Sequence, residues 1–515
     1  MTFLGSLVLI VLAAIAAVAL LRLVFPLPGI SRRAPSYALP ADKTGPLSCF
    51  LTEEIDNNPG KTGVVTLNEA SSALAQRLAL VHAAQSAIDA QYYIWHDDTS
   101  GILLLDALLA AARRGVQVRL LLDDNGITGL DPIVATLNAQ PNFEIRLFNP
   151  STVRRPKTLG YAFSFVRMNR RMHNKSFIVD GTAAIIGGRN IGDEYFAIGE
   201  GQFFLDLDVL AVGPVVARAT RVFDDYWNCA SAFEAETIIS GSGDLTAFQA
   251  RADRVKNSPE AQSFLTEAAT AEDLHIANKE QVEWTDVALV ADDPAKGEGE
   301  VSRDKLLISH FADILGGVST RLDVISAYFV PGVRGARFFT DLAKRGVKVN
   351  VLTNALVTTD VLLVHSGYTR YRRRLLKAGV SLFELKPRPG MATGPDAQLK
   401  PLGLAGASLH AKTFAVDGRR VFIGSLNLDP RSAILNCEMG LIIDSPTMAG
   451  RMQSHFDGPV DAVSYKPQLT PEKRMVWSEA REDGSTRIYQ EEPGASLGQQ
   501  VALTLIGLLP VEWLL

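Results

Sequence analysis

Cysteine is scarce in this sequence, and basic residues do not outnumber acidic ones. The three cysteines, Cys49, Cys229 and Cys437, lie far apart and form no CxxC pair, so neither a zinc ribbon nor a disulfide framework is indicated. We expect three buried thiols. The 51 Lys and Arg residues against 56 Asp and Glu give a formal charge of −5, which provides no overall attraction for nucleic acid. Any anion binding must therefore be local.

Apolar residues, in contrast, are abundant. They make up 47% of the 515 residues, which excludes a disordered or collagen-like chain. At roughly 150 residues per domain, two to four domains are expected.

The first 21 residues carry no charged side chain, and the apolar character continues to residue 25. This is long enough for a helix that crosses a bilayer. A cleaved signal peptide would normally begin with Lys or Arg, so we expect residues 1–25 to be an uncleaved anchor, with export by a signal peptide as the alternative. Arg22, Arg32 and Arg33 follow the segment, and the positive-inside rule then places the catalytic body on the cytoplasmic side.

A second apolar stretch covers residues 496–515. It is interrupted by Pro510 and Glu512 and is too short to span a membrane comfortably. We expect it to pack on the core, with a position at the membrane interface as the alternative.

The chain contains an internal repeat. An apolar run, a helix-period segment ending in Arg114-Gly115 and another apolar run recur 231 residues later, where the matching pair is Arg345-Gly346. The order strand, helix, strand favours parallel pairing in an α/β fold. We therefore expect two halves, residues 60–235 and 300–460, joined by a polar stretch, residues 240–300, that is typical of a linker or surface insertion.

Each half carries one copy of the pattern HxKxxxxD, followed by a turn of small residues and an Asn that lies 17 residues after the His. The members are His173, Lys175, Asp180 and Asn190 in the first copy and His410, Lys412, Asp417 and Asn427 in the second. On a strand, positions i and i+2 point to the same face, so each His and its Lys should project together into one site. A single His-x-Lys pair has little meaning, but two matched copies indicate function.

These motifs resemble the two HKD motifs of the phospholipase D superfamily, and the similarity spans residues 60 to 460. The resemblance implies two pseudo-symmetric α/β/α domains that share one active site. The segments from Gly187 to Tyr195 and from Gly424 to Ser432 are similar to bacterial cardiolipin synthases, most closely the C-type branch. That implies a phosphatidyl transferase of the bacterial inner membrane that makes cardiolipin from phosphatidylglycerol and a second phospholipid, such as phosphatidylethanolamine.

The residue types suit phosphodiester exchange without a metal or cofactor. Lys175 and Lys412 would neutralise the phosphate oxygens, with Asn190 and Asn427 as amide donors. One neutral imidazole would attack phosphorus while the other, protonated, gives its proton to the leaving alcohol. The product of that step is a phosphatidyl-histidine intermediate.

The resemblance also implies roles that the symmetry of the sequence leaves open. By the family pattern His173 is the nucleophile and His410 the acid and base, and Asp206 and Glu438 each orient one imidazole, with Asp208 as a rival. We include Asp180 and Asp417 in the candidate site as motif members, but expect them to stabilise strand ends rather than touch the substrate. Glu194 is expected to be structural.

Basic residues gather between Arg146 and Lys175, where no Asp or Glu occurs and aromatic residues alternate with cations. This pattern predicts contact with anionic lipid headgroups. A weaker basic run lies between Arg370 and Lys377, and the Gly- and Pro-rich run from Pro387 to Leu409 predicts a mobile loop before His410.

Three other functions compete with phosphatidyl transfer. A phospholipase D that hydrolyses phospholipids to phosphatidic acid would use the same intermediate. A nuclease or phosphodiesterase of nucleic acid is disfavoured by the acidic charge and the apolar N-terminus, and an inactive scaffold is disfavoured by two intact motifs. The sequence leaves open the acceptor (phosphatidylethanolamine, phosphatidylglycerol or water), the oligomeric state and any partner protein.

Overall fold

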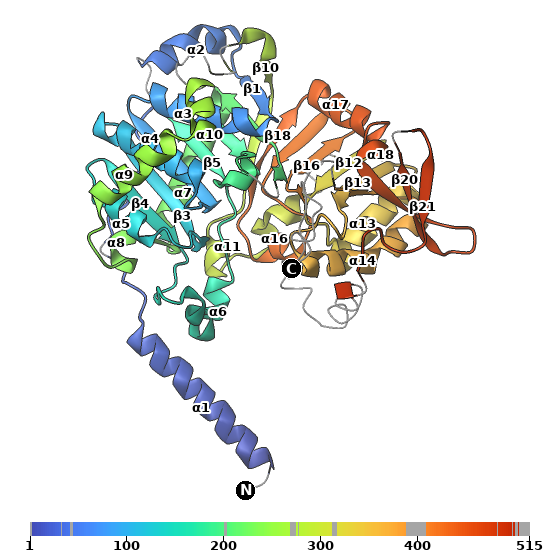
Figure 1. Cartoon of the computed structure of the whole chain (residues 1–515), viewed down its shortest axis with the longest axis horizontal. Coiled ribbons are helices and arrows are strands. Elements are labelled where there is room, and N and C mark those ends of the chain that lie inside the picture. The colour runs from blue at the N-terminus through green and yellow to red at the C-terminus, as the bar shows by residue number, and fades with distance from the viewer. Residues whose placement is uncertain are drawn as a thin grey trace.

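The structure is a computed structural model, and it describes residues 3–31, 33–41, 45–199, 203–267, 274, 276, 278–311, 317–387, 408–481, 483–496, 498–499 and 503. Two α/β halves lie side by side, and one long helix projects from the body (Figure 1). The predicted apolar segment 496–515 lies almost entirely outside the described residues, as does most of the predicted loop between residues 387 and 409.

Nine strands form the sheet of the first half. Their order across the sheet is β10 (Glu283–Thr285), β1 (Thr62–Leu67), β8 (Asp208–Val212), β6 (Ala183–Gly187), β5 (Ser176–Val179), β2 (Ala87–Ile94), β3 (Gln117–Gly126), β4 (Phe143–Phe148) and β9 (Ala232–Glu234). Strands β2, β3 and β4 are parallel, as the repeat predicts. Strand β5, which follows the first HKD histidine, runs antiparallel to both β2 and β6, so the sheet is mixed.

The second sheet repeats this plan. Its order is β11 (Val287–Ala291), β18 (Met439–Asp444), β17 (Arg420–Gly424), β16 (Lys412–Val416), β12 (Arg321–Ser326), β13 (Lys348–Asn354), β14 (Ser381–Leu385), β19 (Ser464–Leu469), β20 (Met475–Ala480) and β21 (Thr486–Tyr489). Strands β12, β13 and β14 are parallel, and β16 is antiparallel to β12 and β17. The motif strands β5 and β16 therefore occupy equivalent places in the two sheets.

Buried side chains form layers on both sides of the sheets. Helices α3 (Ala70–Ala83), α4 (Thr99–Arg113), α5 (Asp131–Asn138), α9 (Leu245–Lys256) and α10 (Pro259–Glu267) cover the outer face of the first sheet. Helices α13 (Gly332–Lys344) and α14 (Leu362–Lys377) cover the second. A central core joins the inner faces of both sheets through α7 (Pro214–Asn228) and α17 (Pro446–Phe456). The burial of this shared apolar surface fixes the two halves against each other.

The repeated Arg-Gly pair ends a helix in both halves. Gly115 follows α4 with φ +99° and Gly346 follows α13 with φ +87°. In each case the next residue, Val116 or Val347, donates its N–H back to a carbonyl of the last helical turn. A residue with positive φ closes a helix most easily when it is glycine, which explains why this pair recurs.

The stretch 240–300, predicted as a linker or surface insertion, adds structure to both halves. Helices α9 and α10 pack on the first half, β10 pairs with β1, and β11 pairs with β18. The connection between the halves is thus built into the edges of both sheets. The remaining short helices are α2 (Pro46–Asn57), α8 (Ala235–Ile238), α11 (Ala295–Glu298), α16 (Pro430–Ile434) and α18 (Val460–Val463).

Helix α1 (Phe3–Val24) projects away from the body (Figure 1). Residues Ser6–Val24 are long and apolar enough to cross a membrane, and none of them is buried inside the protein. The expectation of three buried thiols is wrong for Cys49, which is exposed; Cys437 is buried and Cys229 is partly buried. Helix α2 presents Cys49 to its surface, because the apolar side chains of Leu47 and Leu51 occupy the buried face.

Candidate active site at the junction of the two halves

The two HKD segments are held by the opposite halves of the chain. The N–H of His173 donates to the carbonyl of Cys437 at 2.8 Å, beside a parallel bridge between Met172 and Cys437. The N–H of His410 donates to the carbonyl of Leu205 at 2.8 Å. Next to it, β7 (Phe204–Leu205) pairs in parallel with β15 (Ser408–Leu409). Each HKD segment is therefore positioned by hydrogen bonds that cross the domain junction.

The carboxylate that contacts each HKD histidine also comes from the opposite half. Nδ1 of His173 lies 2.8 Å from Oε2 of Glu438, and Nδ1 of His410 lies 2.5 Å from Oδ2 of Asp206. A carboxylate that accepts the Nδ1 proton leaves Nε2 as the reactive nitrogen of the ring. At His410 the ammonium of Lys412 also lies 2.8 Å from Nδ1. Glu438 and Asp206 precede equivalent strands, β18 and β8, and this explains why each reaches the histidine of the other half.

Two further side chains fix the residue before each histidine. Oδ2 of Asp123 accepts from the N–H of Met172 at 2.8 Å, and Oδ1 of Asn354 accepts from the N–H of Leu409 at 2.9 Å. Sequence reasoning missed both. A signal was available, because Asp123 and Asn354 each lie eight residues after the glycine of the repeated Arg-Gly pair.

The two HKD lysines are buried beside the histidines. Lys175 Nζ donates to the carbonyl of His173 at 2.8 Å, and Lys412 Nζ donates to the carbonyl of His410. The Tyr93 ring packs against both His173, at 5.1 Å between centroids, and the ammonium of Lys175, at 5.5 Å. His173, Lys175 and His410 lie before the motif strands rather than on them, so the predicted strand placement is wrong, but the contacts with Tyr93 bring His173 and Lys175 together as expected. Burial lowers the pKa of both lysines, and for Lys175 the charge of Lys412 lowers it further.

The pKa values of both imidazoles lie well below neutrality. Burial lowers the pKa of His173 to about 4 and that of His410 to about 3, against the attraction of Glu438 and Asp206. Lys175 and Lys412 also lower both values, each acting on the histidine of the other half as well as its own. Burial alone would raise the pKa of Glu438 and Asp206, but the neighbouring cations and imidazoles lower both. The site thus combines two lysines with two carboxylates, whose opposite charges offset each other when all four groups are ionised.

Aromatic side chains surround the second histidine. The ring of Tyr195 meets His410 edge-on at 5.2 Å, and Phe204 lies 5.0 Å from it. The amide of Asn190 donates to Tyr195 Oη at 2.8 Å, and its Oδ1 accepts from Ile94. One N–H of Asn190 is therefore used to hold Tyr195 rather than directed to a phosphate. Asn427 is also buried, and within the described part of the chain its Oδ1 has no hydrogen-bond partner.

Asp180 and Asp417 lie at the opposite ends of the motif strands, away from the histidines. Asp180 accepts from the N–H groups of residues 85–87, and Asp417 accepts from those of residues 319–321. Both have positive φ, 52° and 51°. Their inclusion among the catalytic candidates is corrected by these contacts, which instead support the expected role at a strand end.

Asp208, the alternative to Asp206 as the carboxylate that orients a histidine, makes other contacts. It is fully buried and pairs with Arg77 at 2.8 Å and Arg189 at 3.5 Å, so its contacts are with arginines of the first half.

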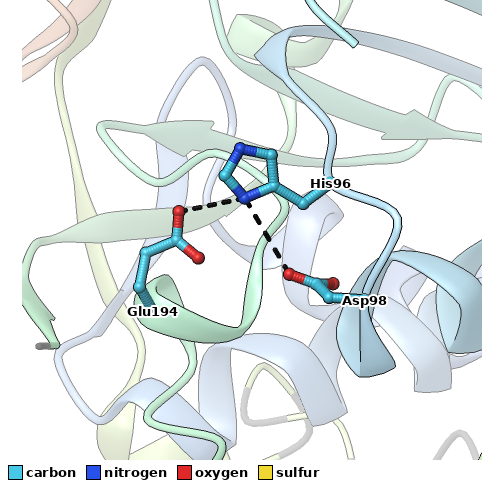
Figure 2. A group of neighbouring side chains, drawn as sticks. All are labelled: His96, Asp98 and Glu194. Carbon is cyan, nitrogen blue, oxygen red and sulfur yellow. Dashed lines mark ion pairs between the residues drawn. The ribbon is translucent and has the colours of Figure 1, made fainter. Parts of the chain in front are cut away.

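Glu194 takes part in a half-buried cluster near the turn after Asn190. Its Oε1 lies 3.2 Å from Nδ1 of His96, and Asp98 Oδ2 lies 3.9 Å from the same nitrogen (Figure 2). Asp98 Oδ1 also caps helix α4 by accepting from Gly101. The cluster joins the loop after β2 to the loop after β6, which agrees with the structural role expected for Glu194.

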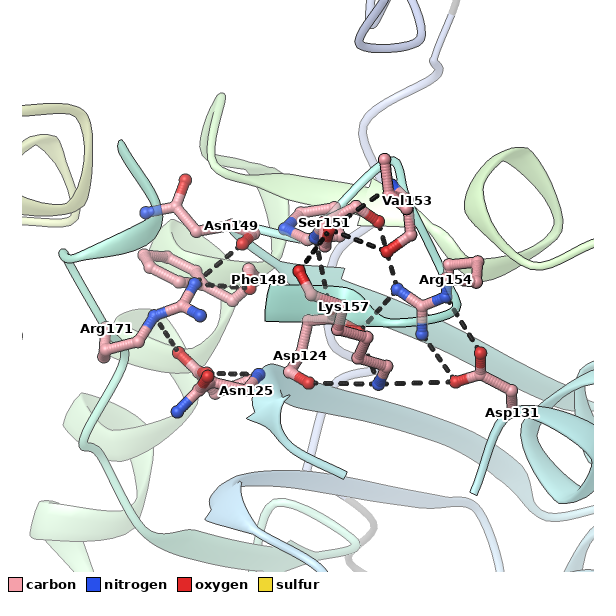
Figure 3. Close-up of polar contacts among 12 residues, drawn as sticks. Asp124, Asn125, Asp131, Phe148, Asn149, Ser151, Val153, Arg154, Lys157 and Arg171 are labelled. Carbon is pink, nitrogen blue, oxygen red and sulfur yellow. Dashed lines mark hydrogen bonds and ion pairs between the residues drawn. The ribbon is translucent and has the colours of Figure 1, made fainter. Parts of the chain in front are cut away.

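Four of the eight cations of the basic stretch, Arg146, Arg154, Lys157 and Arg171, form ion pairs inside the protein. Arg154 and Lys157 contact Asp124 and Asp131, as Figure 3 shows. Arg146 pairs with Glu144. The sequence showed no acidic residue within the stretch, but the carboxylates come from the preceding elements.

In the weaker basic run, two cations make contacts within the protein. Arg372 is buried and pairs with Glu384 at 3.0 Å and Glu492 at 2.7 Å. Arg373 donates to the carbonyl of Lys473.

Residues 78–227 and 313–459 match the family described as cardiolipin synthase, PLD-like domain. The chain belongs to this family. It is 43% identical to cardiolipin synthase C of Escherichia coli over 468 residues, which cover 89% of this chain and 97% of the relative. An uncharacterized protein of Helicobacter pylori is 32% identical over 463 residues, covering 86% of this chain and 87% of the relative. The two matched segments of the family contain one HKD motif each.

A solved structure has the same fold. Phosphatidylserine synthase of Haemophilus influenzae covers 90% of this chain and 100% of its own, with a TM-score of 0.54 and 13% sequence identity. At that identity the likeness concerns the fold alone.

Proposed function

We propose that the protein is a membrane-anchored phosphatidyltransferase that makes cardiolipin from phosphatidylglycerol and a second phospholipid, such as phosphatidylethanolamine. The observation that carries the proposal is the reciprocal pairing of His173 with Glu438 and of His410 with Asp206. It gives two imidazoles whose Nε2 atoms have no hydrogen-bond partner among the described residues, with two ammonium groups beside them, which suits one anionic phosphodiester.

In the first step, the lone pair of His173 Nε2 attacks the phosphorus of the donor phospholipid. The bond from phosphorus to the headgroup oxygen breaks, and protonated His410 gives its Nε2 proton to that oxygen. The product is a phosphatidyl group on His173 and a free headgroup alcohol. Lys175 and Lys412 stabilise the charge on the non-bridging oxygens.

In the second step, neutral His410 removes a proton from a headgroup hydroxyl of phosphatidylglycerol. The oxygen attacks phosphorus, and the bond from phosphorus to His173 breaks. Cardiolipin leaves, and both histidines return to their starting states. Water in place of the hydroxyl would give phosphatidic acid.

Binding of the substrate favours the protonated imidazole that the first reaction step needs. The site balances two cations against two carboxylates, so an added phosphodiester leaves it with one negative charge. That charge raises the pKa of the imidazoles above their values in the empty site, which favours the protonated acid.

Helix α1 supports the anchoring part of the proposal. Its length and apolar composition suit a bilayer span, and cardiolipin synthase C of Escherichia coli matches this chain over 97% of that relative. We place the anchor in a bacterial inner membrane, with the body on the cytoplasmic side because Arg22, Arg32 and Arg33 follow the apolar segment.

The test is a product assay with purified full-length protein in mixed vesicles. We expect cardiolipin when phosphatidylglycerol and phosphatidylethanolamine are both present, together with released ethanolamine. Each lipid alone serves as the control for which one is the donor. Phosphatidic acid as the only product would replace the transferase with a phospholipase D.

A further inference from the structure

Helix α6 (Tyr161–Met168) packs against the end of helix α1. Arg22 Nε donates to the carbonyl of Phe163 at 2.8 Å, and the rings of Phe25 and Phe163 stack at 6.1 Å between centroids. Thr152 Oγ1 donates to the carbonyl of Phe25 at 3.0 Å. Figure 1 shows α6 on the face of the body from which α1 projects.

The position along α1 of the residues that contact α6 determines how deep α6 would lie in a bilayer. The membrane-compatible segment runs from Ser6 to Val24, so Arg22 and Phe25 stand at its boundary with water. An arginine at the end of a span extends its head to the interface, and aromatic rings favour the same level. Helix α6 contacts both residues, and it therefore lies at interfacial depth wherever α1 crosses a bilayer.

Helix α6 and the turn before it expose large apolar side chains. Leu159 is 43% exposed, Phe165 44% and Val166 67%. We call these three residues the apolar ridge. On the opposite side of the same segment, Phe163 and Met168 are buried at 3%. The segment thus has apolar side chains on its buried surface and on its exposed surface. This is typical of a helix at a membrane interface rather than of a helix that faces water.

A network of ion pairs holds the segment that carries the ridge. Arg154 and Lys157 lie between Asp124 and Asp131, and Ser151 donates its N–H to Asp124 at 2.9 Å (Figure 3). Tyr161, at the start of α6, donates to Asn125 at 3.1 Å. Arg154 and Lys157 are thus engaged within the protein, whereas Leu159, Phe165 and Val166 are exposed, with Arg155 as an exposed cation nearby.

The ridge is joined closely to the catalytic centre. Only four residues separate the end of α6 from His173. Among them, Asn169 accepts from Arg431 at 2.9 Å, and the carbonyl of Arg171 accepts from Cys437. The depth of α6 therefore sets the height of His173 above the bilayer.

We propose that the apolar ridge inserts into the interfacial layer of the bilayer that α1 crosses and holds the active site against the lipid surface. The inference rests on the anchoring part of the proposed function and not on the reaction catalysed. The occupant is lipid rather than a protein partner, because the ridge continues from the end of the membrane helix at the same depth.

Depth measurements test the proposal directly. The full-length protein, in a C49S background that removes the exposed native thiol, carries one cysteine at position 166 (Val166→Cys) and a fluorescent label there. Matched labels stand at Ile10→Cys on α1 and at Ile488→Cys on β21, residues that are 66% and 50% exposed. The proteins are reconstituted into vesicles with nitroxide-bearing lipids or with a water-soluble quencher.

We expect lipid quenching at positions 10 and 166, and quenching from water at position 488. Quenching from water at position 166 together with lipid quenching at position 10 would overturn the inference while leaving the anchor intact. Quenching from water at both positions would overturn the inference together with the anchor.

An activity test separates membrane docking from chemistry. The double variant F165E/V166E places two charges on the ridge, and I488E is the matched control. We expect kcat/KM on vesicle lipid to fall by at least about tenfold in the ridge variant only, because charged side chains leave the interface. Turnover of a short-chain phospholipid dissolved below its micellar concentration should stay within about twofold. Equal losses on both substrates, or no loss on vesicles, would contradict the proposal.

Discussion

His173 in the first half of the chain is held by Glu438 in the second, 265 residues away, with Nδ1 and Oε2 2.8 Å apart. The reciprocal pair, His410 and Asp206, spans 204 residues in the other direction. Neither HKD histidine pairs with a carboxylate of its own half. The candidate active site is complete only when the two halves are joined, and the apolar core between the sheets joins them.

Neutralising either carboxylate should lower kcat while leaving substrate binding almost unchanged. In E438Q or D206N the side-chain amide no longer selects the Nδ1–H tautomer, so we expect kcat to fall by at least about a hundredfold with little change in KM. Steady-state cardiolipin formation measures both constants. D286N, on an exposed carboxylate paired with Lys61, is the control and should be unchanged. A normal kcat in both active-site variants would exclude the orienting role.

The H173A and H410A variants should differ in activity on a substrate whose leaving group needs no protonation. H173A and H410A are each expected to lose at least about a thousandfold in activity on natural lipids, because nucleophile and acid act as a unit. With a p-nitrophenyl phosphatidyl ester, H410A should still release one equivalent of nitrophenol in a burst, whereas H173A should not. The opposite pattern would exchange the roles of the two residues.

Anion binding should draw a proton into the site. The pKa values of about 4 for His173 and about 3 for His410 mean that both rings are neutral at pH 7 in the empty enzyme. A bound anion raises these values, so protons are taken up, not released, on binding near neutral pH. Calorimetric titration with tungstate in buffers of different ionisation enthalpy should give an uptake of about one proton. The H173A/H410A variant should show none.

The two motif aspartates should affect stability more than chemistry. D180A and D417A each remove a carboxylate that accepts several backbone N–H groups, which we expect to cost about 3 kcal/mol of the free energy of unfolding. Thermal unfolding of each variant measures the loss. The folded fraction should keep kcat within about threefold of the parent enzyme, and a loss as large as that of H173A would place these residues in the reaction.

Removal of divalent ions should leave the reaction intact. The proposed mechanism neutralises the phosphate with Lys175 and Lys412, a task that a metal ion performs in other phosphoryl transfers. We expect full cardiolipin synthesis after treatment with EDTA and exchange into metal-free buffer. Activity that is lost and then restored by one added metal would direct attention to His96, Asp98 and Glu194, the described side chains that lie closest to a ligand arrangement.

The sequence by itself determined the elements that repeat. Two matched HxKxxxxD motifs, the recurrent Arg-Gly helix ends and the N-terminal apolar run are local patterns, and local backbone geometry and hydropathy are enough to interpret them. They gave the two-half α/β plan, the His and Lys pairs and the candidate membrane helix. The carboxylate partners came from the family resemblance.

Only the tertiary structure decided which groups meet across the junction. It pairs each HKD histidine with a carboxylate of the opposite half, places Asp180 and Asp417 at the far strand ends, and pairs Arg154 and Lys157 with Asp124 and Asp131. It also exposes apolar side chains of the segment before His173 beside helix α1. Contacts between residues far apart in sequence depend on how the buried faces of two sheets pack, and no local pattern encodes that register.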